Sequence, residues 1–290
     1  MKLTRRNIIH SVAAISGFGL SDLTIAKINM HSSIDLTNPM DNVYAFSKLA
    51  GSLKKETVHY FYDGTIYGMA SEESYPLFNY SGVMKFVWQP IKNNSYRYRM
   101  FDIGCFTDLI TGVPLEEFKN PFTNEVIKVL QPRAGPYDFI AKPEILDWRQ
   151  SGDQLWISNS QGLQMPNRLD PKKWPLGSTG EIINFRYIFG YRGKLSDIED
   201  QRANNVPSLQ YFSEISPWYP FLRMGKRPGF NYWSLQGNKI KSLSDISPVV
   251  LAYIDKNEPG FIDNEQPWIQ TANAYSQYME EMKNRPISDR

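Results

Sequence analysis

The sequence predicts a mainly β protein: an antiparallel, barrel-like sheet of the lipocalin or calycin kind, with a helix before the sheet and another at the C-terminus. Short runs of β-branched and aromatic residues follow one another closely, bounded by Gly, Pro, Asn, Asp or Ser. Few helical patterns interrupt them, which disfavours a parallel α/β sheet. The 290 residues, 41% of them apolar and 14% aromatic, suffice for one sizeable core. We therefore expect a single domain over residues 27–290.

The first element is a helix over residues 38–53. Asn38 and Pro39 provide a helix start, apolar residues recur at helical spacing, and Gly51 ends the pattern. Two β-prone runs follow in residues 57–68, and we expect a hairpin turn at Asp63-Gly64 between them. Further strands are predicted at residues 82–89, 96–106, 125–130, 154–158, 181–191 and 209–212. Residues 265–284 predict a helix that closes one face or end of the sheet.

Residues 1–26 have the three parts of an export leader. A basic start is followed by the moderately apolar residues 7–20, and Thr24 and Ala26 supply small residues for cleavage. The apolar part is shorter than the roughly 20 residues a spanning helix needs, so we expect no permanent membrane anchor. Arg5 and Arg6, after Thr4 and before Asn7-Ile-Ile, resemble the twin-arginine signal, although an ordinary secretory leader would also carry basic residues. We expect the twin-arginine machinery to be a partner and the periplasm to be the destination.

Composition argues against several classes of function. The net charge of +2 comes from 32 basic and 30 acidic residues without long runs of one sign, which disfavours nucleic-acid and membrane-surface binding. One cysteine, Cys105, and three histidines are too few for the usual N/S site of a transition metal, so we expect no metal. The sequence has neither a Walker loop nor a dinucleotide fingerprint, and we expect no cofactor.

Residues 216–230 form the most unusual segment, because aromatic, proline, glycine and cationic residues alternate within it. One interpretation is a rigid loop lining a pocket, with Trp218 and Tyr219 as flat walls and Arg227 holding an oxygen of the ligand. The alternative is a structural loop whose rings plug the end of a barrel. Arg186 and Trp88, in predicted strands, complete the set of candidate ligand-binding residues.

This segment also carries a family resemblance. Ser216-Pro-Trp-Tyr-Pro, Met224-Gly and Pro228-Gly are similar to the pattern of twin-arginine-exported bacterial proteins grouped as domain of unknown function 1838. Similar blocks are Lys48-Leu-Ala-Gly-Ser-Leu, Gly64-Thr-Ile-Tyr-Gly, Asp108-Leu-Ile-Thr-Gly and Asn120-Pro-Phe-Thr-Asn-Glu. Departures are Phe221, where a tryptophan is frequent, and Asn124, where glycine is common. The resemblance covers most of residues 38–260 and implies an exported β protein, but no catalytic residue.

Three residues are weak candidates for catalysis. In the strand predicted at 96–106, Tyr98 and Asp102 share one face while Arg97 and Arg99 share the other. If that face looks into a barrel, Asp102 is a desolvated carboxylate near phenols; otherwise it forms a turn at the strand end with Gly104. His59 lies within the first predicted strand and is either a general base or structural.

Two function classes therefore stay open. In the first, the barrel binds a small, largely apolar molecule. In the second, the same pocket performs acid/base chemistry without a cofactor, of the isomerase, hydratase or cyclase type. A buried carboxylate facing tyrosine or arginine favours the enzyme, and a wholly apolar interior favours the binding protein.

Overall fold

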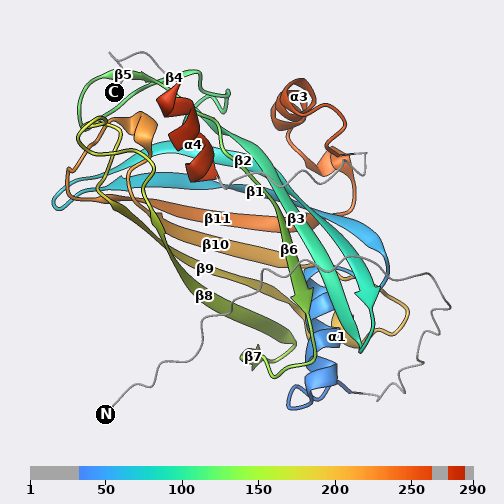
Figure 1. The fold of residues 1–290 in the computed structure, drawn as a ribbon. Coiled ribbons are helices and arrows are strands. Elements are labelled where there is room, and N and C mark those ends of the chain that lie inside the picture. Colours follow the sequence, from blue (N-terminus) through green and yellow to red (C-terminus); the bar gives the residue numbers. More distant parts are fainter. Residues whose placement is uncertain (1–32, 263–273, 285–290) are drawn as a thin grey trace, which may run out of the picture. The chain divides into compact units, whose positions relative to one another are not determined.

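The computed structural model describes residues 33–262 and 274–284, and within them nine strands form one antiparallel sheet in the order β6-β3-β2-β1-β11-β10-β9-β8-β7 (Figure 1). The strands are β1 (Glu56–Met69), β2 (Ser74–Ile91), β3 (Ser95–Thr107), β6 (Arg133–Ala141), β7 (Trp148–Ser151), β8 (Gln154–Pro166), β9 (Ile182–Lys194), β10 (Leu209–Ser216) and β11 (Phe230–Ile240). A separate hairpin joins β4 (Glu117–Lys119) to β5 (Val126–Lys128). The predicted mainly β, antiparallel, barrel-like fold is confirmed.

The sheet curls into a half-barrel. The helices of the described chain are α1 (Pro39–Ala50), α2 (Leu195–Glu199), α3 (Pro248–Asn257) and α4 (Ala274–Lys283), with short 3₁₀ turns η1 (Pro220–Leu222) and η2 (Leu243–Asp245). Phe46 of α1 lies 6.4 Å from the ring of Tyr98 on β3 and 5.8 Å from that of Tyr191 on β9. Four strands separate β3 from β9 in the sheet. Both rings can reach Phe46 only because the sheet wraps around α1.

Helix α1 forms where the sequence predicts it. The Asn38 side chain accepts a hydrogen bond from the Met40 amide at 2.9 Å, Pro39 occupies the first turn, and Gly51 is the C-cap. Lys239 of β11 donates to the carbonyls of Lys48 and Gly51, which lie at the end of the helix. Helix α1 therefore closes one end of the concave face.

The other end is closed by α4 and by the segment that contains η1. Tyr219 packs against Trp233 of β11 and against Tyr278 of α4, while Tyr275 of α4 packs against Phe185 of β9. The expected closure of the sheet by a C-terminal helix is thus found in residues 274–283, and the earlier part of that predicted helix lies outside the described residues.

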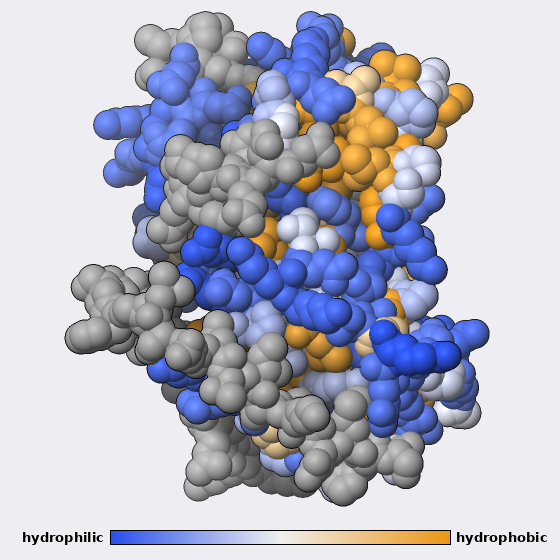
Figure 2. Space-filling view, turned by 90° about the vertical axis from the view of Figure 1, so that its right-hand side faces the viewer, coloured by the Kyte–Doolittle hydropathy of each residue, from blue (hydrophilic) through white to orange (hydrophobic). Residues whose placement is uncertain are grey.

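The convex face has its own, smaller apolar cluster. Val83 of β2 and Ile103 of β3 are buried there with Val250 and Ile254 of α3. Figure 2 shows the side of the molecule that lies to the right in Figure 1. Hydrophilic residues prevail on this side, and hydrophobic ones gather toward its upper right. None of the helices in the described part of the chain is long and apolar enough to cross a membrane.

The predicted hairpin at Asp63-Gly64 is wrong. Strand β1 runs unbroken through this pair, with Asp63 opposite Ser81 and Gly64 opposite Tyr80 on β2. A Cβ at Gly64 would lie 2.2 Å from the Ser234 carbonyl oxygen of β11. Glycine is required here by the close approach of a neighbouring strand, not by a turn.

Candidate functional site

Two carboxylic acids, Asp102 of β3 and Glu214 of β10, lie on the concave face between its two closed ends. Asp102 sits in the interior of β3, paired with Met84 of β2 and Ala134 of β6, and does not end the strand. Glu214 and Phe212 are two residues apart on β10, so they lie on the same face of the sheet. Phe212 packs against Trp233 on that face. Both residues are partly exposed although they are deep in the protein. They therefore border space that water can reach.

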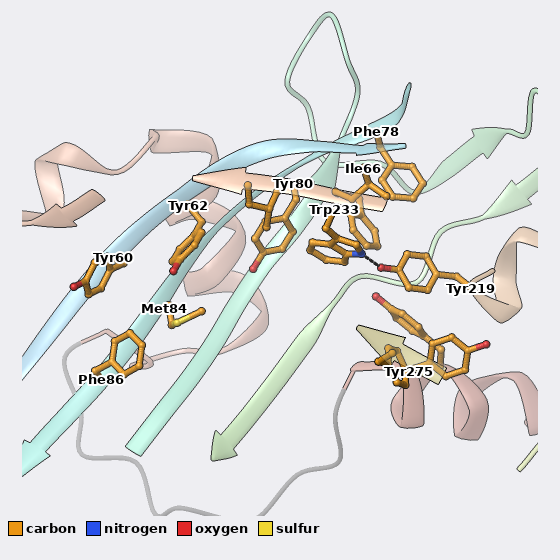
Figure 3. Packing of buried hydrophobic residues seen from close by; sticks show 14 of the residues in the cluster. Tyr60, Tyr62, Ile66, Phe78, Tyr80, Met84, Phe86, Tyr219, Trp233 and Tyr275 are labelled. Carbon is orange, nitrogen blue, oxygen red and sulfur yellow. Dashed lines mark hydrogen bonds between the residues drawn. The ribbon is translucent and has the colours of Figure 1, made fainter. Parts of the chain in front are cut away.

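Tyr80 of β2 holds Asp102. Its hydroxyl donates to the carboxyl at 2.7 Å. The ring can lie flat across the sheet because Gly82 and Gly104 lie beneath its hydroxyl: a Cβ at either position would come within 2.6 Å of that oxygen. Gly104, which in the sequence favours a turn after Asp102, thus serves to admit the phenol. Figure 3 shows Tyr60, Tyr62, Tyr80 and Trp233 lying along one side of the sheet.

The environment of the two carboxyls raises their pKa. Burial raises the pKa of Asp102 from 3.8 to about 6, and the hydrogen bond from Tyr80 opposes this rise. Burial raises the pKa of Glu214 from 4.5 to about 7. Both acids therefore change protonation near neutral pH.

Phenols surround the two acids from several elements. Burial raises the pKa of Tyr137 of β6 to about 12, and both Asp102 and Glu214 add to the rise. Tyr137 therefore lies within electrostatic reach of the two carboxyls at once. We call the whole group the acid–tyrosine site; its residues are Asp102, Glu214, Tyr62, Tyr80, Tyr137, Tyr187, Tyr219 and Tyr278.

The catalytic candidates from sequence fall on different faces. Tyr98 shares the concave face with Asp102 but lies toward α1, where its ring stacks on Trp88 with centroids 4.4 Å apart. His59 follows the opposite alternation from Tyr60 and lies on the convex face, opposite Lys85 of β2. Asp102 is thus the catalytic candidate that the structure brings into the acid–tyrosine site.

The ligand-binding candidates are spread over four places. Trp88 is fully buried beside α1, and Tyr219 accepts a hydrogen bond from the indole of Trp233 in the acid–tyrosine site. Arg186 is exposed on β9 and donates to the Phe185 carbonyl at 2.8 Å. Trp218 and Arg227 do meet, since the Trp218 indole donates to the Arg227 carbonyl at 2.9 Å.

Trp218 and Arg227 both border a surface hollow of about 340 Å³. Trp218 is only 1% exposed and contacts Phe122. The Arg227 guanidinium pairs with Glu73 at 2.8 Å and donates to the Phe122 carbonyl at 3.0 Å. Loop rigidity is thus supported by direct contacts, and a ligand in this hollow stays a prediction.

Sequence reasoning missed Glu214, Tyr80 and Tyr137. The predicted strand at 209–212 stops short of Glu214, although continued alternation from Phe212 would have placed it on the same face. Strand β6, which carries Tyr137, has Gly135 and Pro136 in its first half, and these residues hide the strand pattern. No signal near Tyr80 shows that it reaches Asp102.

No group of three or more His, Cys, Asp or Glu side chains placed to hold a metal ion occurs in the described residues.

The fold and site define a half-barrel β protein whose concave face carries acids among aromatic rings. The chain belongs to the family described as protein of unknown function DUF1838, whose model matches residues 55–282. No curated protein matches the chain.

Proposed function

We propose that the acid–tyrosine site is the active site of a cofactor-independent acid/base enzyme that acts on a small, largely apolar molecule. The observation that carries the proposal is the pair of concave-face carboxyls, Asp102 and Glu214, with pKa values of about 6 and about 7. General acid–base catalysis is most efficient when the pKa of the catalytic group lies near the working pH. The reaction is of the isomerase, hydratase or cyclase type.

The two acids suit complementary roles. Between their pKa values Asp102 is mostly ionised and accepts a proton, while Glu214 is mostly protonated and donates one. Tyr80 orients Asp102 through its hydrogen bond. Trp233, Phe106 and Phe212 supply an apolar wall beside the acids, with ring centroids of Trp233 and Phe106 5.7 Å apart.

Solvent-deuterium exchange tests this function. The purified protein is incubated in D₂O with a small-molecule extract of the producing cells, and mass spectrometry follows protein-dependent deuterium uptake or conversion. We expect Asp102→Asn and Glu214→Gln each to abolish this deuterium uptake or conversion. Asp138→Asn is the control and should keep it, because Asp138 lies on the face of the sheet opposite to the acid–tyrosine site. Carboxyl carbon NMR titration is the second readout: if both acids titrate below about pH 4.5, as ordinary carboxyls do, the proposed function is wrong.

A second candidate is a binding protein without catalysis. It is favoured by the apolar end of the concave face near α1, where Trp88, Tyr98 and Phe139 stack in sequence. Native mass spectrometry of protein purified from its own host distinguishes the two. An unaltered co-purifying molecule that survives prolonged incubation supports binding alone.

Export through the twin-arginine pathway completes the proposal. It is supported by Arg5 and Arg6 within the leader-like residues 1–26, which lie outside the described residues. Replacing both arginines by lysine keeps the charge but removes the paired guanidinium groups. We expect the precursor to stay in the cytoplasm, and normal periplasmic accumulation would contradict the assignment.

A further inference from the structure

We propose, on the basis of the acid/base function above, that the molecule bound at the acid–tyrosine site is an organic cation: an amine or ammonium group on an apolar or aromatic body.

The first support is that the two acids have no basic partner within the described residues, so the negative charge that each carries when ionised is uncompensated. Ion pairs in the described chain engage other acids, such as Asp138 with Arg97 and Glu258 with Arg133, and neither Asp102 nor Glu214 takes part in one. The ε-amino group of Lys239 on β11 donates to carbonyls at the α1 end. Among the residues that the structure describes, the groups whose pKa is raised by one or both acids in addition to burial are the phenols of the site, and their raised pKa keeps them neutral. A bound anion would meet like charge, whereas a cation would supply the missing counter-charge.

The second support is a cluster of buried aromatic rings beside the acids. The ring of Trp233 lies 5.3 Å from that of Tyr80 and 5.7 Å from that of Phe106, and Tyr219 approaches it edge-on. Figure 3 shows Trp233 and Tyr80 side by side, with Tyr219 reaching toward the indole. Ring faces attract cations, most strongly at tryptophan.

The third support is a pair of buried phenol oxygens. The hydroxyls of Tyr62 and Tyr278 are buried, with 2% and 1% of each residue exposed, and neither has a hydrogen-bond partner in the described part of the protein. Burial is the main cause that raises the pKa of both phenols, and Asp102 adds a smaller contribution to each, so both lie within electrostatic reach of that carboxyl. Ionised carboxylates only accept hydrogen bonds, and phenol oxygens can accept them. An alkylammonium group has three donors and no acceptor, so it complements this set.

A charge series of phenyl compounds tests the inference. Phenethylamine, phenethyl alcohol and phenylpropionate present the same ring with a cationic, neutral or anionic end. Isothermal titration calorimetry of the purified protein near pH 8, where both acids are ionised, measures each affinity. We expect the amine to bind at least about tenfold more tightly than the alcohol, and the carboxylate most weakly. Asp102→Asn and Glu214→Gln should each reduce the preference for the amine about tenfold, while Asp138→Asn should leave it unchanged.

The inference is overturned if the alcohol or the carboxylate binds as tightly as the amine. It is also overturned if the amine shows no binding up to about 10 mM, or if both site variants keep the preference. Unfolding curves of the same samples show that each variant is folded. If the charge preference fails while both acids still titrate near neutral pH, the acid/base function stands and only the ligand class is wrong. If the acids titrate as ordinary carboxyls, the function itself falls.

Discussion

Replacing Asp102 by asparagine removes a charge that the fold is poorly able to solvate, and the effect on stability depends on pH. In the folded protein the pKa of Asp102 is about 6, above its ordinary value of 3.8. Below the ordinary pKa, both the folded and the unfolded chains carry the proton on Asp102, so its ionisation takes nothing from the free energy of unfolding. As the pH rises through 6, the folded protein must ionise a buried acid and loses stability relative to the unfolded chain.

The shift from 3.8 to about 6 corresponds to about 3 kcal/mol at most. Asp102 keeps part of its surface in contact with water, so screening lowers that figure, and we expect a difference of about 1 to 3 kcal/mol. Asparagine retains an oxygen that can accept the Tyr80 hydrogen bond but cannot ionise. Asp102→Asn should therefore match the wild type near pH 3, below the ordinary pKa of 3.8, and exceed its unfolding free energy by about 1 to 3 kcal/mol near pH 8.

Urea unfolding followed by tryptophan fluorescence at several pH values measures this difference. Asp138→Asn is the control with the opposite sign, since Arg97 holds the pKa of Asp138 below its ordinary value. Its carboxylate stabilises the fold at neutral pH, and that contribution is lost as the pH falls through the lowered pKa. If Asp102→Asn is no more stable than the wild type near pH 8, Asp102 is not a buried acid with a raised pKa, and the acid/base assignment loses its main support.

Three further outcomes follow from contacts in the structure. Tyr80→Phe removes the hydrogen bond that opposes the rise, so carboxyl NMR should find the pKa of Asp102 above 6, and an unchanged or lower value would show that Tyr80 does not hold the acid. Gly104→Ala places a methyl group 2.6 Å from the Tyr80 hydroxyl and 2.5 Å from the Ser81 carbonyl oxygen. Urea unfolding should therefore show that the free energy of unfolding falls by about 1 to 3 kcal/mol. Wild-type stability would mean that the Tyr80 ring does not lie over this glycine. In the same urea-unfolding assay, Trp218→Ala should lower the free energy of unfolding by about 3 to 5 kcal/mol, as large core truncations do. Arg227→Ala, on the surface, should lower it by less than about 1 kcal/mol. A small loss for Trp218→Ala would instead favour a role for this residue in the neighbouring hollow.

The sequence predicted those parts of the fold that depend on local pattern. Helix α1 has its start and stop signals within the chain itself, and strand β3 was expected within one residue at each end because its β-prone residues are bounded by turn-forming ones. The hairpin prediction at Asp63-Gly64 was wrong because an Asp-Gly pair is compatible both with a tight turn and with a close contact between strands. Only the pairing of β1 with its neighbours shows which of the two occurs. Strand β11 was not predicted because its inward-facing positions, Asn231, Trp233, Leu235 and Gly237, mix polar, apolar and glycine residues and so give no clear alternation.

The acid–tyrosine site lies beyond such local prediction for a physical reason. Asp102 and Glu214 are on β3 and β10, which are separated in the sheet by β2, β1 and β11, so neither pairing nor alternation alone brings them together. Curling of the sheet around α1 and α4 turns their common face inward, and the glycines at 82, 104 and 237 leave room there for the Tyr80 and Tyr62 rings. A carboxyl placed on that face is desolvated by rings contributed from distant strands, and this desolvation raises its pKa. Asp102 can be identified as a candidate from the sequence because its own strand has an aromatic face. That Glu214 belongs to the same site follows only from the curvature of the sheet.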